Sequence, residues 1–413
     1  MIFDSTKEKI FFYNFPVILF SLIPFFLITG PFLSDLSLSL ICLFFLIYCS
    51  IKRNFSYFKN KYFFFFLLFW CYLILNTLIN NFNFDSLKIS FFFFRFGVFV
   101  VAIVTLLEFD DKFLRFFFYC ILICFAALVL DGFYQYFFDE NILGWKKSVR
   151  VSSFFGDEFI LGSYLSRLWP ILFGLSIMIF KQNNKLILLF ILSEVLIFLS
   201  GDRTAFFYIN LSAIFIIFFS KKLFKLRLAT LMISLLIIIA VNLFNSDSKE
   251  RVIDQTMAQM NLSNDNEKKN IFSIQHESLF ISSYKIFLDN KIIGVGVKNF
   301  RNFCDNEKYY ENEFSCSTHP HNTYLQILSE TGIIGFLFLI TIVIYYCIYV
   351  FKHIFFRFKG VNYFTDFEIC LLSGIAIYLW PFIPTGSIFN NWMNITMVLN
   401  LPLFIWSRKY FKD

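Results

Sequence analysis

The chain has 413 residues, of which 58% are hydrophobic and only 16% are charged, with a formal net charge of +7. A water-soluble domain of this length needs more charged residues to cover its surface, so the composition excludes that class. The basic residues stand in short clusters between apolar stretches, which argues for a membrane protein and against a nucleic-acid partner.

Apolar stretches of roughly 20 residues, the length that crosses about 30 Å of hydrocarbon, recur along the whole chain. They predict an all-α polytopic membrane protein with about 12 transmembrane helices and one large polar loop. In chain order the predicted helices cover residues 10–30, 34–51, 61–80, 88–107, 113–131, 159–180, 184–200, 203–220, 226–244, 322–350, 366–384 and 387–407. The predicted divisions are an N-terminal transmembrane bundle, the polar loop and the C-terminal helices, at residues 1–244, 245–321 and 322–413.

The basic clusters also predict how the chain is oriented. If the N-terminus with Lys7 and Lys9 is cytoplasmic, every strongly basic short connection falls on the cytoplasmic side. These connections are residues 52–61, 112–115, 181–185, 221–227 and 352–359, together with the C-terminal tail. The short connections on the other side contain no Lys or Arg, so both termini are expected in the cytoplasm and the polar loop outside.

Within the polar loop, Ser278–Leu288 is predicted to form an amphipathic helix on the membrane surface. Asn290–Phe300, which reads NKIIGVGVKNF, is predicted to be a turn punctuated by glycines. The short spans 184–200 and 203–220 are joined by only Gly201-Asp202, so they are expected to form a hairpin with its tip near the outer surface.

A first candidate for chemistry is His319-Pro320-His321-Asn322, where the polar loop re-enters the membrane. A neutral His321 imidazole can take a proton from a hydroxyl, and Asn322 can cap the following helix, which carries Glu330. The alternative is that the motif is only a turn with a good cap. A metal site would need a third ligand, for which His276 or a carboxylate is available.

Two cationic segments are expected on the same outer face. Arg203 lies at the hairpin tip, where a guanidinium at the hydrocarbon edge suits a lipid-linked diphosphate. Lys146-Lys147-Ser148-Val149-Arg150 breaks the charge bias of the outer side, which indicates an anionic partner. The alternatives are that Arg203 reaches lipid headgroups or pairs with Asp202, and that the second segment only binds anionic lipids.

Three further charges, Arg95, Arg167 and Glu194, map to the outer halves of their predicted helices. Charges inside a membrane are costly and are usually functional or mutually paired. We expect Glu194 to pair with one of the two arginines and to support a polar cavity that opens outward. The sequence contains no nucleotide-binding motif and no acidic metal motif on the outer side, so no cofactor and no metal are expected.

Cys316–Gly335, which reads CSTHPHNTYLQILSETGIIG, resembles the hallmark segment of the O-antigen ligase and O-antigen polymerase superfamily. In ligases a His and an Asn, Ser or Gln are followed, after nine residues, by a Gly and a small apolar residue. His321, Asn322, Gly332 and Ile333 fit that spacing. GVGVKNF, the turn at Arg203 and the Arg150 segment with FFGDEFILGSY add to the resemblance.

The resemblance implies a metal-independent, inverting glycosyltransferase with a GT-C-like fold at the periplasmic face of the bacterial inner membrane. Its donor would be a glycan on undecaprenyl diphosphate. His321 would activate or orient the acceptor hydroxyl, with Asn322, His319 and Glu330 in support. Arg203 and Arg150 would hold the diphosphate, and the polar loop would cover the cavity.

The functional alternatives differ in the acceptor that receives the glycan. It would be the lipid A–core in a ligase, the leading hypothesis, and another lipid-linked repeat unit in a polymerase. Protein or exopolysaccharide acceptors are a third possibility, and a transporter or lipid flippase is the alternative from another class. With the loop on the oxidising side of the membrane, Cys304 and Cys316, a dozen residues apart, are expected to form a disulfide just ahead of His321.

Overall fold

The computed structural model describes residues 10–80, 83–180, 186–221, 224–244, 254–260 and 271–410. Within these ranges the regular elements are helices, and the one β-type feature is an isolated bridge between Glu140 and Lys146. The predicted all-α class is confirmed. Predictions that involve Lys7, Lys9, the connection 181–185 or most of the polar loop before residue 271 lie outside the described residues.

The first half of the chain contains η1 (Ile10–Asn14), α2 (Phe15–Phe26), α3 (Pro31–Ile51), η2 (Ser56–Phe58), α4 (Lys61–Ile79), α5 (Phe84–Phe92), α6 (Phe94–Phe109), α7 (Phe113–Phe138), η3 (Ser153–Phe155), α8 (Leu161–Phe180), α9 (Ile187–Leu199), α10 (Arg203–Phe219) and α11 (Phe224–Phe244). The second half contains α13 (Gln255–Gln259), α14 (Ile274–Asp289), α15 (Phe300–Phe303), α16 (Thr323–Phe358), α17 (Asp366–Leu379), α18 (Asn391–Val398) and α19 (Asn400–Tyr410).

Seven helices in the described ranges are long and apolar enough to cross a membrane: Pro31–Ile51, Lys61–Ile79, Phe84–Phe109, Phe113–Phe138, Leu161–Phe180, Phe224–Val241 and Thr323–Phe358. Three shorter apolar helices are Phe11–Phe26, Ile187–Leu199 and Arg203–Phe219. These ten correspond to the first ten predicted spans. The last two predicted spans correspond to α17 and to the pair α18 and α19, so the number of crossings stays a prediction.

Helix α8 lies at the centre of the bundle. It packs against α7, α10 and α17, and 72% of its most apolar window is buried. Its side chains Tyr164, Leu165 and Leu168 are fully buried. By contrast, α4 and α16 are only 17% and 11% buried over the corresponding windows, because their apolar side chains face outward, as lipid-facing helices require.

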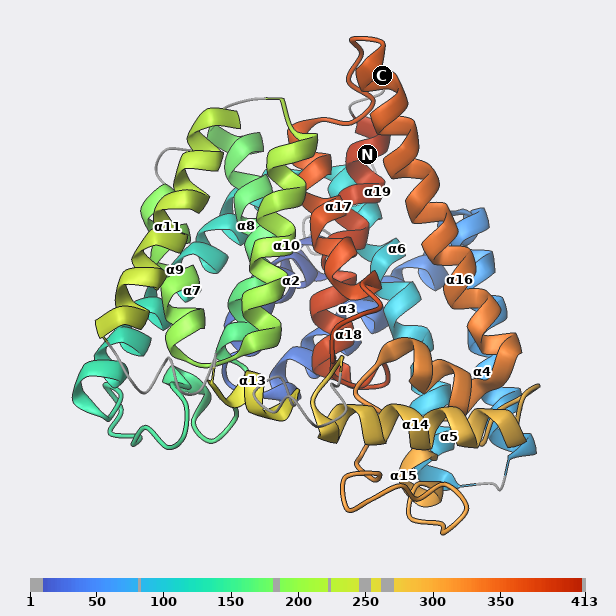
Figure 1. The fold of residues 1–413 in the computed structure, drawn as a ribbon. Coiled ribbons are helices and arrows are strands. Elements are labelled where there is room, and N and C mark those ends of the chain that lie inside the picture. Colours follow the sequence, from blue (N-terminus) through green and yellow to red (C-terminus); the bar gives the residue numbers. More distant parts are fainter. Residues whose placement is uncertain are drawn as a thin grey trace.

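The two ends of the bundle differ in what they carry (Figure 1). Helix α19 and the end of α16 lie towards one end, which we call the terminal end. Helices α13, α14 and α15 lie at the opposite end, which we call the loop end, and α14 runs across the direction of the long helices there. The helix predicted at Ser278–Leu288 is therefore present, within the longer α14.

Candidate active site

The segment His319–Asn322 has a defined backbone conformation just before α16. His321 has a φ of 55°, a left-handed value that costs free energy in a residue with a side chain. Its carbonyl oxygen accepts a hydrogen bond of 2.8 Å from Thr385 N–H. Asn322 is the N-cap of α16, because its Oδ1 accepts hydrogen bonds from two N–H groups of the first turn. The predicted cap is present, and the turn before it is strained.

The His321 imidazole is half-buried, and this burial lowers its pKa below the ordinary value near 6.5. The ring is therefore neutral at pH 7. Its Nε2 lies 3.4 Å from Ser317 Oγ. A neutral imidazole has one nitrogen with a free lone pair, which can accept the proton of a hydroxyl.

His319 stacks on His321, with ring centroids 4.2 Å apart, but both of its nitrogens have protein partners. Nδ1 lies 3.0 Å from Thr318 Oγ1, and Nε2 lies 3.2 Å from the carbonyl oxygen of Thr385. Burial is the main cause that lowers the pKa of His319 to about 4. These contacts give His319 a supporting role and leave it no free nitrogen for a metal.

His276 comes from α14, far from the motif in sequence, yet its ring centroid lies 5.5 Å from that of His321. Its Nδ1 is buried and has no hydrogen-bond partner in the described part of the chain. Burial, then the charges of His321 and Arg203, lower the pKa of His276 to about 4. Sequence analysis singled out His276 only as a possible metal ligand.

Arg203 begins α10 at the tip of the predicted hairpin, and the loop reaches it through α13. Its Nη1 donates to Thr256 Oγ1 at 2.8 Å and its Nη2 donates to Gln259 Oε1 at 3.0 Å. Asp202 is the N-cap of α10, accepting from Ala205 N–H at 3.0 Å. Neutral side chains therefore orient Arg203, and within the described residues it forms no ion pair with Asp202.

Arg150 belongs to the segment between α7 and α8, and its guanidinium lies 5.6 Å from the centre of the Phe159 ring. It interacts electrostatically with Arg203 and with Asp202. Burial raises the pKa of Asp202, and the charges of Arg150 and Arg167 act in the opposite direction. His276 thus lies next to His321, and its charge interactions extend to Arg203, which in turn interacts electrostatically with Arg150.

Comparison with known families gives one match: residues 187–340 fit the model described as O-antigen ligase. This range includes the hairpin with Arg203, the loop with His276 and the motif at His321, but not Arg150. This part of the chain is a domain of the O-antigen ligase and polymerase superfamily. Such a domain supports an enzyme of the glycosyltransferase type. No curated protein matches the chain.

The expected pairing of Glu194 with an arginine is wrong. Glu194 in α9 accepts a hydrogen bond of 2.5 Å from Ser234 in α11. Arg95 in α6 pairs with Asp35 in α3 at 2.8 Å. Arg167 in α8 is 1% exposed and lies between the rings of Tyr208 and Tyr378, at 4.9 and 4.7 Å from their centres. Each group has a nearer partner on an adjacent helix, which sequence could not place.

Glu330, in the first part of α16, is a buried carboxylate that links α16 to the loop and, through Gln326, to the segment before α18. Its Oε1 accepts from Phe300 N–H at 3.2 Å, and its Oε2 accepts from Gln326 Nε2 at 3.0 Å. Gln326 also donates to Ser387 Oγ and accepts from Ile388 N–H. Glu330 therefore positions the loop and the 381–388 segment against α16.

The glycine-containing turn of the polar loop is interlocked with α16. α16 is interrupted at Gly332, where φ is 63° and ψ is −166°. Val295 N–H and Gly296 N–H donate to the carbonyl oxygens of Ser329 and Glu330, at 2.9 and 2.8 Å. The turn predicted at Asn290–Phe300 is therefore present, and its backbone continues the hydrogen bonding that α16 gives up at the break.

Cys304 and Cys316 form a disulfide, the pair that sequence analysis expected. Asp305 lies beside them, but a cystine offers no thiolate for a metal. Arg301, three residues before Cys304, is linked to the residue that precedes His319, because its Nη2 donates to the Thr318 carbonyl at 3.1 Å. The disulfide and Arg301 together restrain the chain just before His319.

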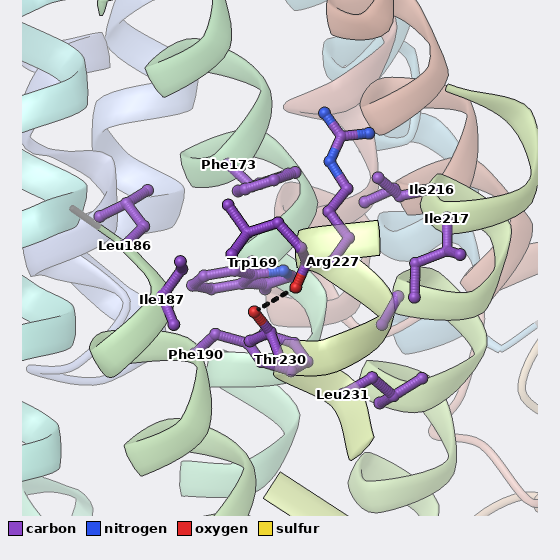
Figure 2. A pocket seen from close by; sticks show the side chains of 12 residues that line it. Trp169, Phe173, Leu186, Ile187, Phe190, Ile216, Ile217, Arg227, Thr230 and Leu231 are labelled. Carbon is purple, nitrogen blue, oxygen red and sulfur yellow. Dashed lines mark hydrogen bonds between the residues drawn. The ribbon is translucent and has the colours of Figure 1, made fainter. Parts of the chain in front are cut away.

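A separate cavity lies between α8, α9, α10 and α11 (Figure 2). Its volume is about 60 Å³, and apolar side chains such as Trp169 and Phe190 form most of its lining. Arg227, near the start of α11, is its charged residue, and in the view of Figure 2 its guanidinium points away from Trp169. None of the active-site candidates lines this cavity.

Proposed function

We propose that the protein is an O-antigen ligase-type glycosyltransferase. It moves a glycan from undecaprenyl diphosphate to the lipid A–core at the periplasmic face of the inner membrane. The observation that carries the proposal is the group formed by a neutral His321, His276 and Arg203, inside a domain of this superfamily. Both termini would then lie in the cytoplasm, and membrane lipids would surround the helices.

In the proposed reaction the acceptor hydroxyl attacks C1 of the donor sugar. The new O–C1 bond forms as the bond from C1 to the diphosphate oxygen breaks, and attack from the face opposite the leaving group inverts the anomeric centre. The hydroxyl proton passes to the lone pair of His321. The pKa of His321 is lowered, so this base is available at neutral pH.

Arg203 and Arg150 would bind the diphosphate, which gains one negative charge when it leaves. A guanidinium offers several N–H donors in a fixed fork, which suits phosphate oxygens. Thr256 and Gln259 orient Arg203 without neutralising it, so its charge stays available to the leaving group. The chemistry therefore needs no metal ion.

The test is transfer from a purified lipid-diphosphate donor by reconstituted protein. We expect His321→Ala to lower the rate by about 10²–10⁴-fold, because it removes the base. Arg203→Ala is expected to lower it by about 10²–10³-fold, because it removes stabilisation of the leaving group. Arg115→Ala, an exposed arginine at the start of α7, is the matched control and should be unaffected. Full activity of both site variants would contradict the mechanism.

The acceptor is tested in cells that lack the protein. Loss of the whole lipopolysaccharide ladder is the result expected of a ligase. A single attached repeat unit would instead identify a polymerase, which uses the same donor chemistry with a different acceptor.

A further inference from the structure

His276 has no task in the mechanism above, although it lies inside the group of candidate residues. It is the third residue of α14, whose N-cap Ser273 accepts a hydrogen bond from His276 N–H at 3.4 Å. Helix α14 packs against α16, which begins just after His321. A surface helix of the loop therefore carries an imidazole to the motif from about 45 residues away in sequence.

The hydrogen bonding of His276 differs from that of its neighbour His319. Both nitrogens of His319 have protein partners, whereas the buried Nδ1 of His276 has none in the described ranges. A buried polar atom without a partner costs free energy unless a ligand or water satisfies it. This unpartnered nitrogen, on a ring that neighbours His321, indicates that His276 meets a group that the described part of the chain does not supply.

The charged groups around His276 show which kind of partner would suit it. Arg203 of α10 and the rings of His321 and His319 are the basic groups on this side. The acidic groups of these segments are already engaged. Glu277 accepts from Ile271 N–H, Glu330 accepts from Phe300 and Gln326, and Asp202 beside Arg203 accepts from Ala205 N–H. Lys298 and Arg301 are further positive charges that act on His319. An incoming anion is therefore the missing counter-charge.

The proposed reaction creates both a proton and an anion. Breaking the O–H bond of the acceptor releases one proton to His321, and breaking the C1–O bond leaves one additional negative charge on the diphosphate. Catalysis returns to its starting state only when His321 loses that proton again. The two ring centroids are 5.5 Å apart, a separation that one bridging water can span.

We propose that His276 is the second proton carrier of this site: it accepts the acceptor's proton from His321 and delivers it to an oxygen of the leaving diphosphate. The proposal rests on the proposed function, and it makes His276 a catalytic residue that contacts the diphosphate beside Arg203. Atoms balance, because the proton lost by the acceptor hydroxyl is gained by the leaving group. When the diphosphate is bound, its charge favours the protonated form of His276.

The test measures proton uptake when the product binds. Undecaprenyl diphosphate is titrated calorimetrically into the reconstituted protein at pH 6.5, in two buffers with different protonation enthalpies. The buffer-dependent heat gives the number of protons taken up. Comparison with His276→Gln removes any change in the protonation of the diphosphate itself. We expect the wild type to take up more protons than His276→Gln, because the His276 imidazole can share a proton with the bound diphosphate and a glutamine side chain cannot.

Three variants keep this experiment specific. His321→Gln should retain the uptake while losing transfer, and His319→Gln should retain it because the protein already binds both nitrogens of His319. His353→Gln removes the fourth histidine, which bonds the Phe219 carbonyl in another part of the bundle, and should behave as wild type. Equal uptake by the wild type and His276→Gln, or loss of the uptake in His319→Gln, would overturn the assignment.

Transfer kinetics supply the second readout. His276→Gln should lower kcat by about 10²-fold, with little change in the KM of the acceptor, and the loss should deepen as pH rises, because the proton is then scarcer. An unchanged kcat and pH profile would overturn the relay. Failure of the proposed function is a distinct result: the wild type would then not bind undecaprenyl diphosphate at all.

Discussion

Three of the four histidines of the chain meet at the loop end, and each reaches that place by a different route. The strained backbone of His321 is tied to Thr385, the ring of His319 lies between Thr318 and Thr385, and His276 arrives on α14. Burial makes all three neutral at pH 7. Neutrality allows a base to sit beside arginines without adding to the positive charge.

The lowered pKa values predict how stability depends on pH. The pKa of His276 and of His319 is about 4 in the folded protein, below the value near 6.5 of an unfolded chain. Between these values the unfolded chain binds more protons, so the free energy of unfolding should fall as pH decreases from about 6.5 to 4, by at most about 1.4 kcal/mol per pH unit and imidazole. Thermal unfolding measured between about pH 4 and pH 6.5 tests this dependence of stability on pH. His319→Gln should flatten the dependence, and an unchanged slope would contradict the prediction.

At the scale of elements, the break in α16 is the feature on which the site depends. The half of α16 before Gly332 begins at the N-cap Asn322 and carries Gln326 and Glu330, and α16 as a whole is long and apolar enough to cross a membrane. The turn at Ile292–Gly296 fills the break with backbone hydrogen bonds. The loop is thus bonded to the helix that begins at the histidine motif.

The break predicts a large effect of a small substitution. A Cβ at Gly332 would clash with the carbonyl oxygen of Ile292, and the φ of 63° at this position disfavours a side chain. Gly332→Ala should destabilise the protein by more than about 2 kcal/mol and lower transfer. Gly360→Ala is the matched control, because its φ is 77° but a Cβ there meets nothing within 4 Å, so only the backbone strain of about 1 kcal/mol applies. Equal melting temperatures of the two variants would contradict this account.

The disulfide acts on the same region. Cys304 and Cys316 are 12 residues apart, and closing a loop of this length stabilises a fold by about 3 kcal/mol in the chain-entropy account. Replacing both cysteines by serine should lower the melting temperature and should reduce transfer more than it reduces binding of the donor, because Arg203 is held by α13 instead. The control is Cys42→Ser, which removes a free thiol that lies outside the loop closed by the disulfide.

For the whole molecule, the positive-inside pattern predicts that the loop end faces the periplasm. Val149 is 73% exposed and lies in the 139–160 segment of the loop end. Phe358 is 88% exposed and lies at the end of α16. A membrane-impermeant maleimide added to cells with a permeable outer membrane should label Val149→Cys and not Phe358→Cys. Labelling of the wild-type protein measures the background signal from its native cysteines. The reverse labelling would invert the proposed topology.

The sequence alone was enough to determine the helical class, ten of the helix positions, the cap at Asn322, the helix within the loop and the disulfide pair. These are local properties, because hydrophobic length, capping residues and short loop closures are encoded within a few turns of chain. Only the tertiary structure decided the partners of Arg95, Arg167 and Glu194, the approach of His276 to His321, and the interlock of Gly332 with the polar loop. Each of these joins residues from separate helices, and the energy that selects one partner over another arises only when the helices pack.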